Sequence, residues 1–144
     1  MIKQNDPTLR SEIQSFGCNF LAHLAMHRED WQAYEIEDIY QRAVARGIID
    51  SNCKVQQPQD LLALIGSDLR QIGGVNLLAP HDRWGVKESD ARVQFRIARW
   101  SQRHSRHQHF TLYNQKGELY DPFDARMASY SLEREQLMGY QFYG

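Results

Sequence analysis

Apolar side chains recur at helical spacing in three segments of the first half of the chain. The first predicted helix spans Asn19 to Glu29, and its apolar face holds Phe20, Leu21, Leu24 and Ala25. A second helix ends at Gly47, a favoured residue just beyond a helix, and its pattern is set by Tyr34, Ile36, Ile39, Tyr40, Ala43 and Val44. A third, shorter helix starts at Pro58 and stops at Gly66, because proline suits the first helical position.

The second half of the chain has a different pattern, with short β-branched or aromatic runs separated by Gly, Pro, Asn and Asp. Five strands are predicted, at Val75 to Ala79, Val93 to Trp100, Phe110 to Tyr113, Glu118 to Tyr120 and Tyr140 to Tyr143. Helices followed by strands are typical of an α+β fold. Residues 1–144 contain no low-complexity linker, so we expect one domain.

The segment from Ala91 to His107 allows two interpretations. Val93, Phe95 and Ile97 alternate as in a strand. Five arginines in the same segment also fall at helical spacing and would form a docking stripe on a helix: Arg92, Arg96, Arg99, Arg103 and Arg106. We favour the strand.

The composition narrows the class of function. With 17 Lys and Arg against 18 Asp and Glu, the chain lacks the basic excess of a general nucleic-acid binder. The first residues show no signal peptide, and no apolar run reaches the roughly 18 residues of a membrane span. The sequence therefore predicts a cytoplasmic protein that does not bind membranes, and Cys18 and Cys53 are expected to be free thiols.

Cys18 is the candidate nucleophile because it precedes an apolar helical pattern. At a helix start, the dipole and the unpaired backbone N–H groups favour a thiolate and lower the thiol pKa. The same N–H groups can stabilise the oxyanion that forms when a thiolate attacks a carbonyl. Cys53 has no helix start directly after it, and we interpret it as structural.

His109 is the candidate base and Asp121 its partner. His109 opens an apolar strand, and the next strand ends at Asp121, so the two strands predict a β-hairpin. A loop of Gln115 to Gly117 would set Thr111 opposite Asp121. In that register Asp121 lies diagonally across from His109 and within side-chain reach, where it can hold the imidazole tautomer.

Gly17-Cys18, His109-Phe110 and Asp121-Pro122 together resemble the papain-like cysteine peptidase superfamily, in particular small bacterial and phage-type members such as bacteriocin-leader peptidases. The resemblance implies N-terminal helices packed on a mostly antiparallel sheet, and a triad of Cys18, His109 and Asp121. It also makes Gln4 the candidate second oxyanion donor, with Gln14 as its rival. Asn19 departs from the family, which often has glycine after the cysteine, as does the long arginine-rich segment before His109.

Other residues carry weaker signals. His23 and His27 stand four apart on the first predicted helix, but two histidines leave zinc short of ligands, so no metal or other cofactor is predicted. His107 is an alternative base. Gly73-Gly74 lacks the residues of a phosphate-binding loop and is interpreted as a turn.

The sequence thus predicts a cysteine peptidase or amidase that works through a thioester on a peptide or protein, including a peptidoglycan peptide. The competing class is a catalytically inactive binding module of the same fold. It would use the surface around Arg92 to Arg106 to hold an acidic partner, because residues 91–117 contain no Asp or Glu.

Overall fold

The computed structural model describes residues 1–79, 81–127 and 130–144. Its helices are α1 (Ser11–Phe16), α2 (Cys18–His27), α3 (Ala33–Ala45) and α4 (Pro58–Leu64), with a short 3-10 turn η1 (Tyr130–Leu132) near the C-terminus. The three predicted helices are confirmed as α2, α3 and α4. The short α1 was not predicted because only Ile13 among its residues is a buried apolar side chain.

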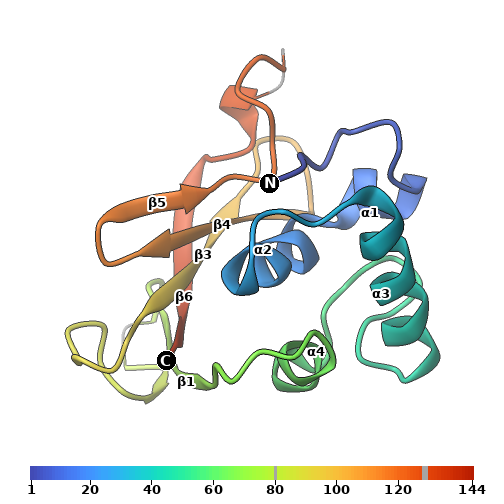
Figure 1. Ribbon diagram of the computed structural model, residues 1–144. Coiled ribbons are helices and arrows are strands. Elements are labelled where there is room, and N and C mark those ends of the chain that lie inside the picture. Colours follow the sequence, from blue (N-terminus) through green and yellow to red (C-terminus); the bar gives the residue numbers. More distant parts are fainter. Residues whose placement is uncertain (80, 128–129) are drawn as a thin grey trace.

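The strands form one antiparallel sheet in the order β2-β1-β6-β3-β4-β5. Their bounds are β1 (Gln71–Asn76), β2 (Arg83–Gly85), β3 (Phe95–Ser101), β4 (Gln108–Asn114), β5 (Gly117–Tyr120) and β6 (Gln136–Tyr143). Figure 1 shows the helices gathered on one side of this sheet, with α2 lying against β4. The α+β class is therefore confirmed.

The core lies between the helices and the sheet. Fully buried side chains from α2 meet fully buried side chains from the central strands, among them Phe20, Leu21, Leu24, Ile97, Leu112 and Tyr143. Burying large apolar side chains of this kind supplies about 1.5–3 kcal/mol each. This packing fixes the start of α2 against the start of β4, and the candidate site lies at that junction.

Gly17 separates α1 from α2 and has a steric reason to be glycine. A Cβ atom at this position would lie 2.5 Å from the Ile13 carbonyl oxygen. The chain therefore closes α1 and starts α2 at once, and Cys18 becomes the first residue of α2.

The first strand was predicted at the wrong place. The predicted strand was Val75 to Ala79, but β1 starts at Gln71 and ends at Asn76. Gly73 and Gly74 therefore lie inside the strand and not in a turn. A Cβ atom at Gly74 would lie 2.8 Å from the Trp84 indole nitrogen and 2.9 Å from the Gln141 amide, which explains glycine within a strand. The short strand β2 was not predicted, and β6 starts four residues earlier than expected.

The favoured strand is confirmed for part of the arginine-rich segment, as β3 (Phe95–Ser101), whereas Arg92, Arg103 and Arg106 lie outside it. The helical stripe is therefore absent. Several of its arginines form ion pairs instead: Arg92 with Asp90, Arg96 with Glu88 and Arg103 with Glu135.

Within the described residues, no helix combines the length and the apolarity needed to cross a bilayer.

Candidate functional site

Cys18 is buried where the start of α2 meets β4. Its thiol donates a hydrogen bond to the Gln108 carbonyl oxygen, with Sγ 3.4 Å away. Gly17 contributes no side-chain cap, so the first N–H groups of α2 remain uncapped. The start of α2 therefore contacts the start of the strand that carries His109.

The predicted direction of the Cys18 pKa shift was wrong. Burial raises the pKa of the Cys18 thiol to about 12, although the backbone N–H groups of Phe110, Asn19 and Cys18 itself act in the opposite direction. A helix start lowers a thiol pKa when the sulfur is at least partly solvated. Here the loss of water around the sulfur outweighs the N–H groups, so the thiol is held neutral.

His109 and Asp121 meet although the turn between their strands was mispredicted. The turn contains only Gln115 and Lys116, because Asn114 pairs with Gly117. A bulge opposite Leu112 and Tyr113 then adds one residue to β5: Tyr113 pairs with Glu118, and Leu112 pairs with Tyr120. Beyond the bulge the predicted register returns, and His109 Nε2 lies 2.7 Å from Asp121 Oδ1.

Asp121 is buried and accepts hydrogen bonds from several directions. Oδ1 accepts from His109 and from the Phe123 backbone N–H at 2.9 Å. Oδ2 accepts from the Tyr130 hydroxyl at 3.0 Å and from Arg134 Nη2 at 2.7 Å. Burial alone would raise the pKa of Asp121, but the bonds from His109, Phe123 and Arg134 outweigh it and hold the pKa well below its usual value.

The imidazole of His109 is completely buried and rests edge-on against the Phe123 ring, with centroids 5.2 Å apart. Because the ionised Asp121 only accepts, Nε2 of His109 donates the hydrogen bond to Oδ1. Nδ1 is buried and has no hydrogen-bond partner among the described residues. The Cys18 thiol bonds to the carbonyl of Gln108, the residue that precedes His109, and not to the His109 ring.

Gln4 is buried close to the aspartate segment. Its backbone N–H donates to the Pro122 carbonyl at 2.7 Å, and its Nε2 donates to the Gln14 carbonyl at 2.9 Å. Gln14 uses its own amide on the Leu9 carbonyl at 2.6 Å. Of the two rivals, Gln4 is the one tied directly to Asp121-Pro122, and its second amide N–H is not used in these bonds.

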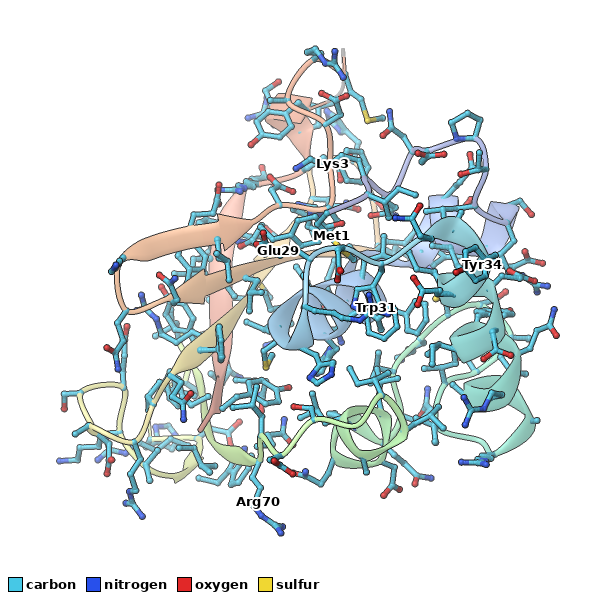
Figure 2. The ribbon with its side chains drawn as sticks, in the orientation of Figure 1. Met1, Lys3, Glu29, Trp31, Tyr34 and Arg70 are labelled. Carbon is cyan, nitrogen blue, oxygen red and sulfur yellow. The ribbon has the colours of Figure 1, made fainter. Side chains whose placement is uncertain are left out.

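The N-terminal segment is also held to the same loop by Lys3. Its Nζ donates to the Asp121 carbonyl oxygen at 2.6 Å, and Figure 2 shows Lys3 beside the segment that follows β5. The Tyr120 hydroxyl donates to the Ile2 carbonyl at 2.7 Å. The N-terminal segment and the loop that follows β5 thus meet beside the candidate site.

Sequence reasoning missed Tyr130, Arg134 and Glu133. Tyr130 and Arg134 bond to Asp121, as described above. Glu133 accepts a hydrogen bond from Gln102, and burial raises its pKa, while the nearby imidazole of His109 acts in the opposite direction. None of these residues follows a strand or helix pattern that would have marked it.

The remaining histidine candidates have other environments. His23 contacts the Asn19 carbonyl through Nδ1 and the Tyr143 hydroxyl through Nε2, both at 2.8 Å, so both ring nitrogens are engaged. His107 is exposed, lies before β4 and packs its ring against Phe16, with centroids 4.8 Å apart. Among the described residues, no group of three His, Cys, Asp or Glu side chains could hold a metal ion.

Fold and site together define an α+β protein in which a buried histidine–aspartate pair lies beside a cysteine at a helix start. The family model described as protein of unknown function DUF261 matches residues 1–137, and the chain belongs to this family. Neither a curated protein nor a solved structure gives a match.

Proposed function

We propose that this protein is a papain-like cysteine hydrolase that cleaves a peptide or other amide bond, with Cys18 as nucleophile, His109 as base and Asp121 as the group that orients His109. One observation carries the proposal: the imidazole is fixed by Asp121 through Nε2, while its buried Nδ1 is left without a partner. A buried ring nitrogen is costly to leave without a hydrogen-bond partner, and the thiol of Cys18 is the partner that cysteine hydrolysis would supply.

The reaction follows from these positions. Nδ1 takes the thiol proton, and Sγ attacks the substrate carbonyl carbon to form a tetrahedral oxyanion. The Cys18 backbone N–H and Gln4 Nε2 are the proposed donors to that oxyanion. The C–N bond then breaks, the leaving amine takes the proton from His109, and the acyl group remains on sulfur as a thioester. A water molecule, deprotonated by His109, attacks the thioester to release the acid and restore the thiol.

In this proposal the observed arrangement, in which the buried Cys18 thiol is bonded to the Gln108 carbonyl, is the resting state. The thiol bonded to Gln108 and the pKa of about 12 describe a protected cysteine. Activation moves Sγ from the Gln108 carbonyl to Nδ1 of His109, the adjacent residue. Catalysis then depends on a minor open state, as in proteins whose binding-competent conformation is only fractionally populated.

Alkylation of the two cysteines tests the proposal. Cys53 is the internal control, because it too is a buried free thiol whose pKa is raised by burial. We expect iodoacetamide to label Cys18 roughly tenfold faster than Cys53 near pH 7, since pairing with His109 makes the thiolate. His109→Gln should remove this advantage. Peptide mass spectrometry gives both rates in one sample.

The same experiment contains its check for folding. If His109→Gln unfolds the protein, Cys53 also becomes fast, so a slow Cys53 proves that the variant is folded. Equal labelling of Cys18 and Cys53 in the wild type would overturn the hydrolase proposal.

The second candidate is an inactive binding module of the same fold. The observation in its favour is the Cys18 thiol itself, which is buried and bonded to a backbone carbonyl instead of a base. Its proposed partner is acidic, but three of the arginines of the predicted docking surface are already neutralised by ion pairs. We therefore rank it below the hydrolase.

A further inference from the structure

A cavity of about 460 Å³ lies between the helices and the sheet. Asn19 and His23 of α2 form one wall, and side chains of β1, β3 and β6 form the opposite wall. A volume of this size suits a short peptide segment or a small molecule. Two lining residues, Asn19 and Phe110, directly follow Cys18 and His109 in the chain. The His109 side chain itself, one residue earlier in β4, points to the opposite face of the strand.

Arg99 is the unusual residue of this cavity. Among the described residues, five arginines form no ion pair, and four of them are exposed: Arg46, Arg70, Arg83 and Arg106. Arg99 alone is partly buried, and it lines the cavity. This guanidinium is partly shielded from water but has no carboxylate partner. Binding an anion would compensate for the hydration that it has lost.

The other lining groups fit a peptide rather than a simple anion. Gln71 and Gln141 join side-chain amides across β1 and β6, with Nε2 of Gln71 2.8 Å from Oε1 of Gln141. Primary amides both donate to and accept from a peptide backbone. Trp84 adds an apolar surface, and it is about half exposed.

The charge of the cavity is set by few groups. Burial lowers the pKa of His23 to about 4, so this imidazole is neutral near pH 7. Asp82 is the acidic lining residue, but it is exposed and forms no ion pair with Arg99 within the described residues. Arg99 is therefore free to bind an anion that enters the cavity.

We propose that the cavity is a substrate subsite in which Arg99 binds a carboxylate of a peptide held next to Cys18. This inference rests on the proposed hydrolase function in one respect: the bound peptide is a substrate only if the protein is a hydrolase. Binding of the peptide does not require hydrolysis. Two sources supply the carboxylate, an acidic side chain or the C-terminus of the peptide. The planar guanidinium binds either one through paired hydrogen bonds.

Peptide binding tests the proposal directly and without turnover. The probes are the tripeptides Ac-Ala-Glu-Ala-NH₂, Ac-Ala-Gln-Ala-NH₂ and Ac-Ala-Ala-Ala with a free carboxylate. The readout is the NMR signal of the Trp84 indole N–H, assigned with Trp84→Phe, in wild type and in Cys18→Ala. We expect the glutamate peptide or the free acid to bind roughly tenfold more tightly than the glutamine peptide, and the stronger of the two identifies the carboxylate source.

Two matched variants assign the effect to Arg99. Arg99→Gln should abolish the preference for the carboxylate and leave binding of the glutamine peptide unchanged. Arg70→Gln removes the same charge next to the lining residue Gln71, and Figure 2 shows Arg70 pointing away from the body of the molecule. It should keep the preference.

The outcomes separate the subsite from the catalytic proposal. Carboxylate binding with an unreactive Cys18 would keep the subsite and overturn the hydrolase. A reactive Cys18 without carboxylate preference would keep the hydrolase and overturn the subsite. A preference that survives Arg99→Gln, or no perturbation of Trp84 by any of the peptides, would also overturn it.

Discussion

The two halves of the candidate site are built in opposite ways. Asp121 is charged and surrounded by donors, from His109 on one oxygen to Arg134 on the other. Cys18 lies in the other half, and its thiol is neutral with one weak bond to a carbonyl. Most polar interactions of the site thus hold His109 and Asp121 in place, whereas Cys18, the proposed nucleophile, is buried and neutral.

Helix α2 extends this contrast. It carries both Cys18 and His23. Burial raises the pKa of the Cys18 thiol and lowers the pKa of His23, so both side chains are kept neutral. We call Asp121 and its donors the carboxylate half, and Cys18 and His23 of α2 the helix half. The first holds a charge and the second holds neutral groups, so the two should respond differently to substitution and to pH. This difference can be measured.

The largest effect is expected from Asp121→Asn. The amide keeps one acceptor oxygen and replaces the other with an NH₂ donor, so it cannot accept hydrogen bonds on both sides as the carboxylate does. Arg134 then keeps only Glu118 as a charged partner. Breaking one partner of a buried ion pair costs about 3–5 kcal/mol. We expect the free energy of unfolding, measured by urea denaturation, to fall by about 3 kcal/mol.

Asp124→Asn is the matched control, three residues along the same loop. Asp124 pairs with Arg126, whose side chain is 89% exposed, and such surface pairs contribute less than about 1 kcal/mol. Equal losses in the two variants would show that the carboxylate half is not specially stabilised.

As the pH is lowered, the protein should first lose stability through His23 of the helix half. An unfolded histidine takes up a proton near pH 6.5, whereas buried His23 does so only near pH 4. The unfolded state therefore binds more protons in this window, and stability falls as the pH drops from about 6.5 to 4, by up to about 1.4 kcal/mol per pH unit. Urea denaturation at several pH values measures the slope.

Asp121 behaves differently in the same window. Its pKa is lowered in the folded state, so its contribution is fully present above the unfolded value of about 3.9 and is lost only as the pH falls below it. His23→Gln does not titrate and should flatten the slope between pH 6.5 and 4.5. A slope that persists in this variant would assign the acid sensitivity to other groups.

Cys18→Ala should have a smaller effect on stability. A buried free cysteine acts as a small hydrophobic side chain, and its truncation removes one sulfur atom and one weak hydrogen bond. We expect a loss of about 1 kcal/mol in urea denaturation. Cys53→Ala, at a second buried thiol, is the comparison. A loss at Cys18 as large as that of Asp121→Asn would remove the contrast between the two halves.

The sequence predicted the helices well and the sheet only in part. The apolar periodicity of α2, α3 and α4 reports burial on one helix face, which is a local property. The backbone of Val86 explains glycine at position 73, and the side chains of Trp84 and Gln141 explain it at position 74. All of these residues lie ten or more positions further along the chain, so the local pattern placed this strand too late. Strand β2 buries none of its residues and has no core face to detect.

The candidate site was predictable only in part. The two apolar runs placed His109 and Asp121 on neighbouring strands, but the predicted turn was wrong, and their register is right only because the bulge between Leu112 and Tyr113 offsets that error. The protonation of Cys18 was not predictable, because burial depends on how α2 packs against β4. Arg134 reaches Asp121 from a segment without any periodic pattern.

The smallest expected effect is that of Tyr130→Phe. The Tyr130 hydroxyl donates to Oδ2 of Asp121, an oxygen that Arg134 also serves. Loss of this donor should cost about 0.5–1.5 kcal/mol, the usual net contribution of one hydrogen bond. Urea denaturation of Tyr130→Phe, Asp121→Asn and the double variant measures the coupling. If the hydroxyl acts through the carboxylate, the double variant loses less than the sum of the single losses. Strict additivity would mean that Tyr130 stabilises the loop independently of Asp121, and the carboxylate half would then be a smaller network than proposed.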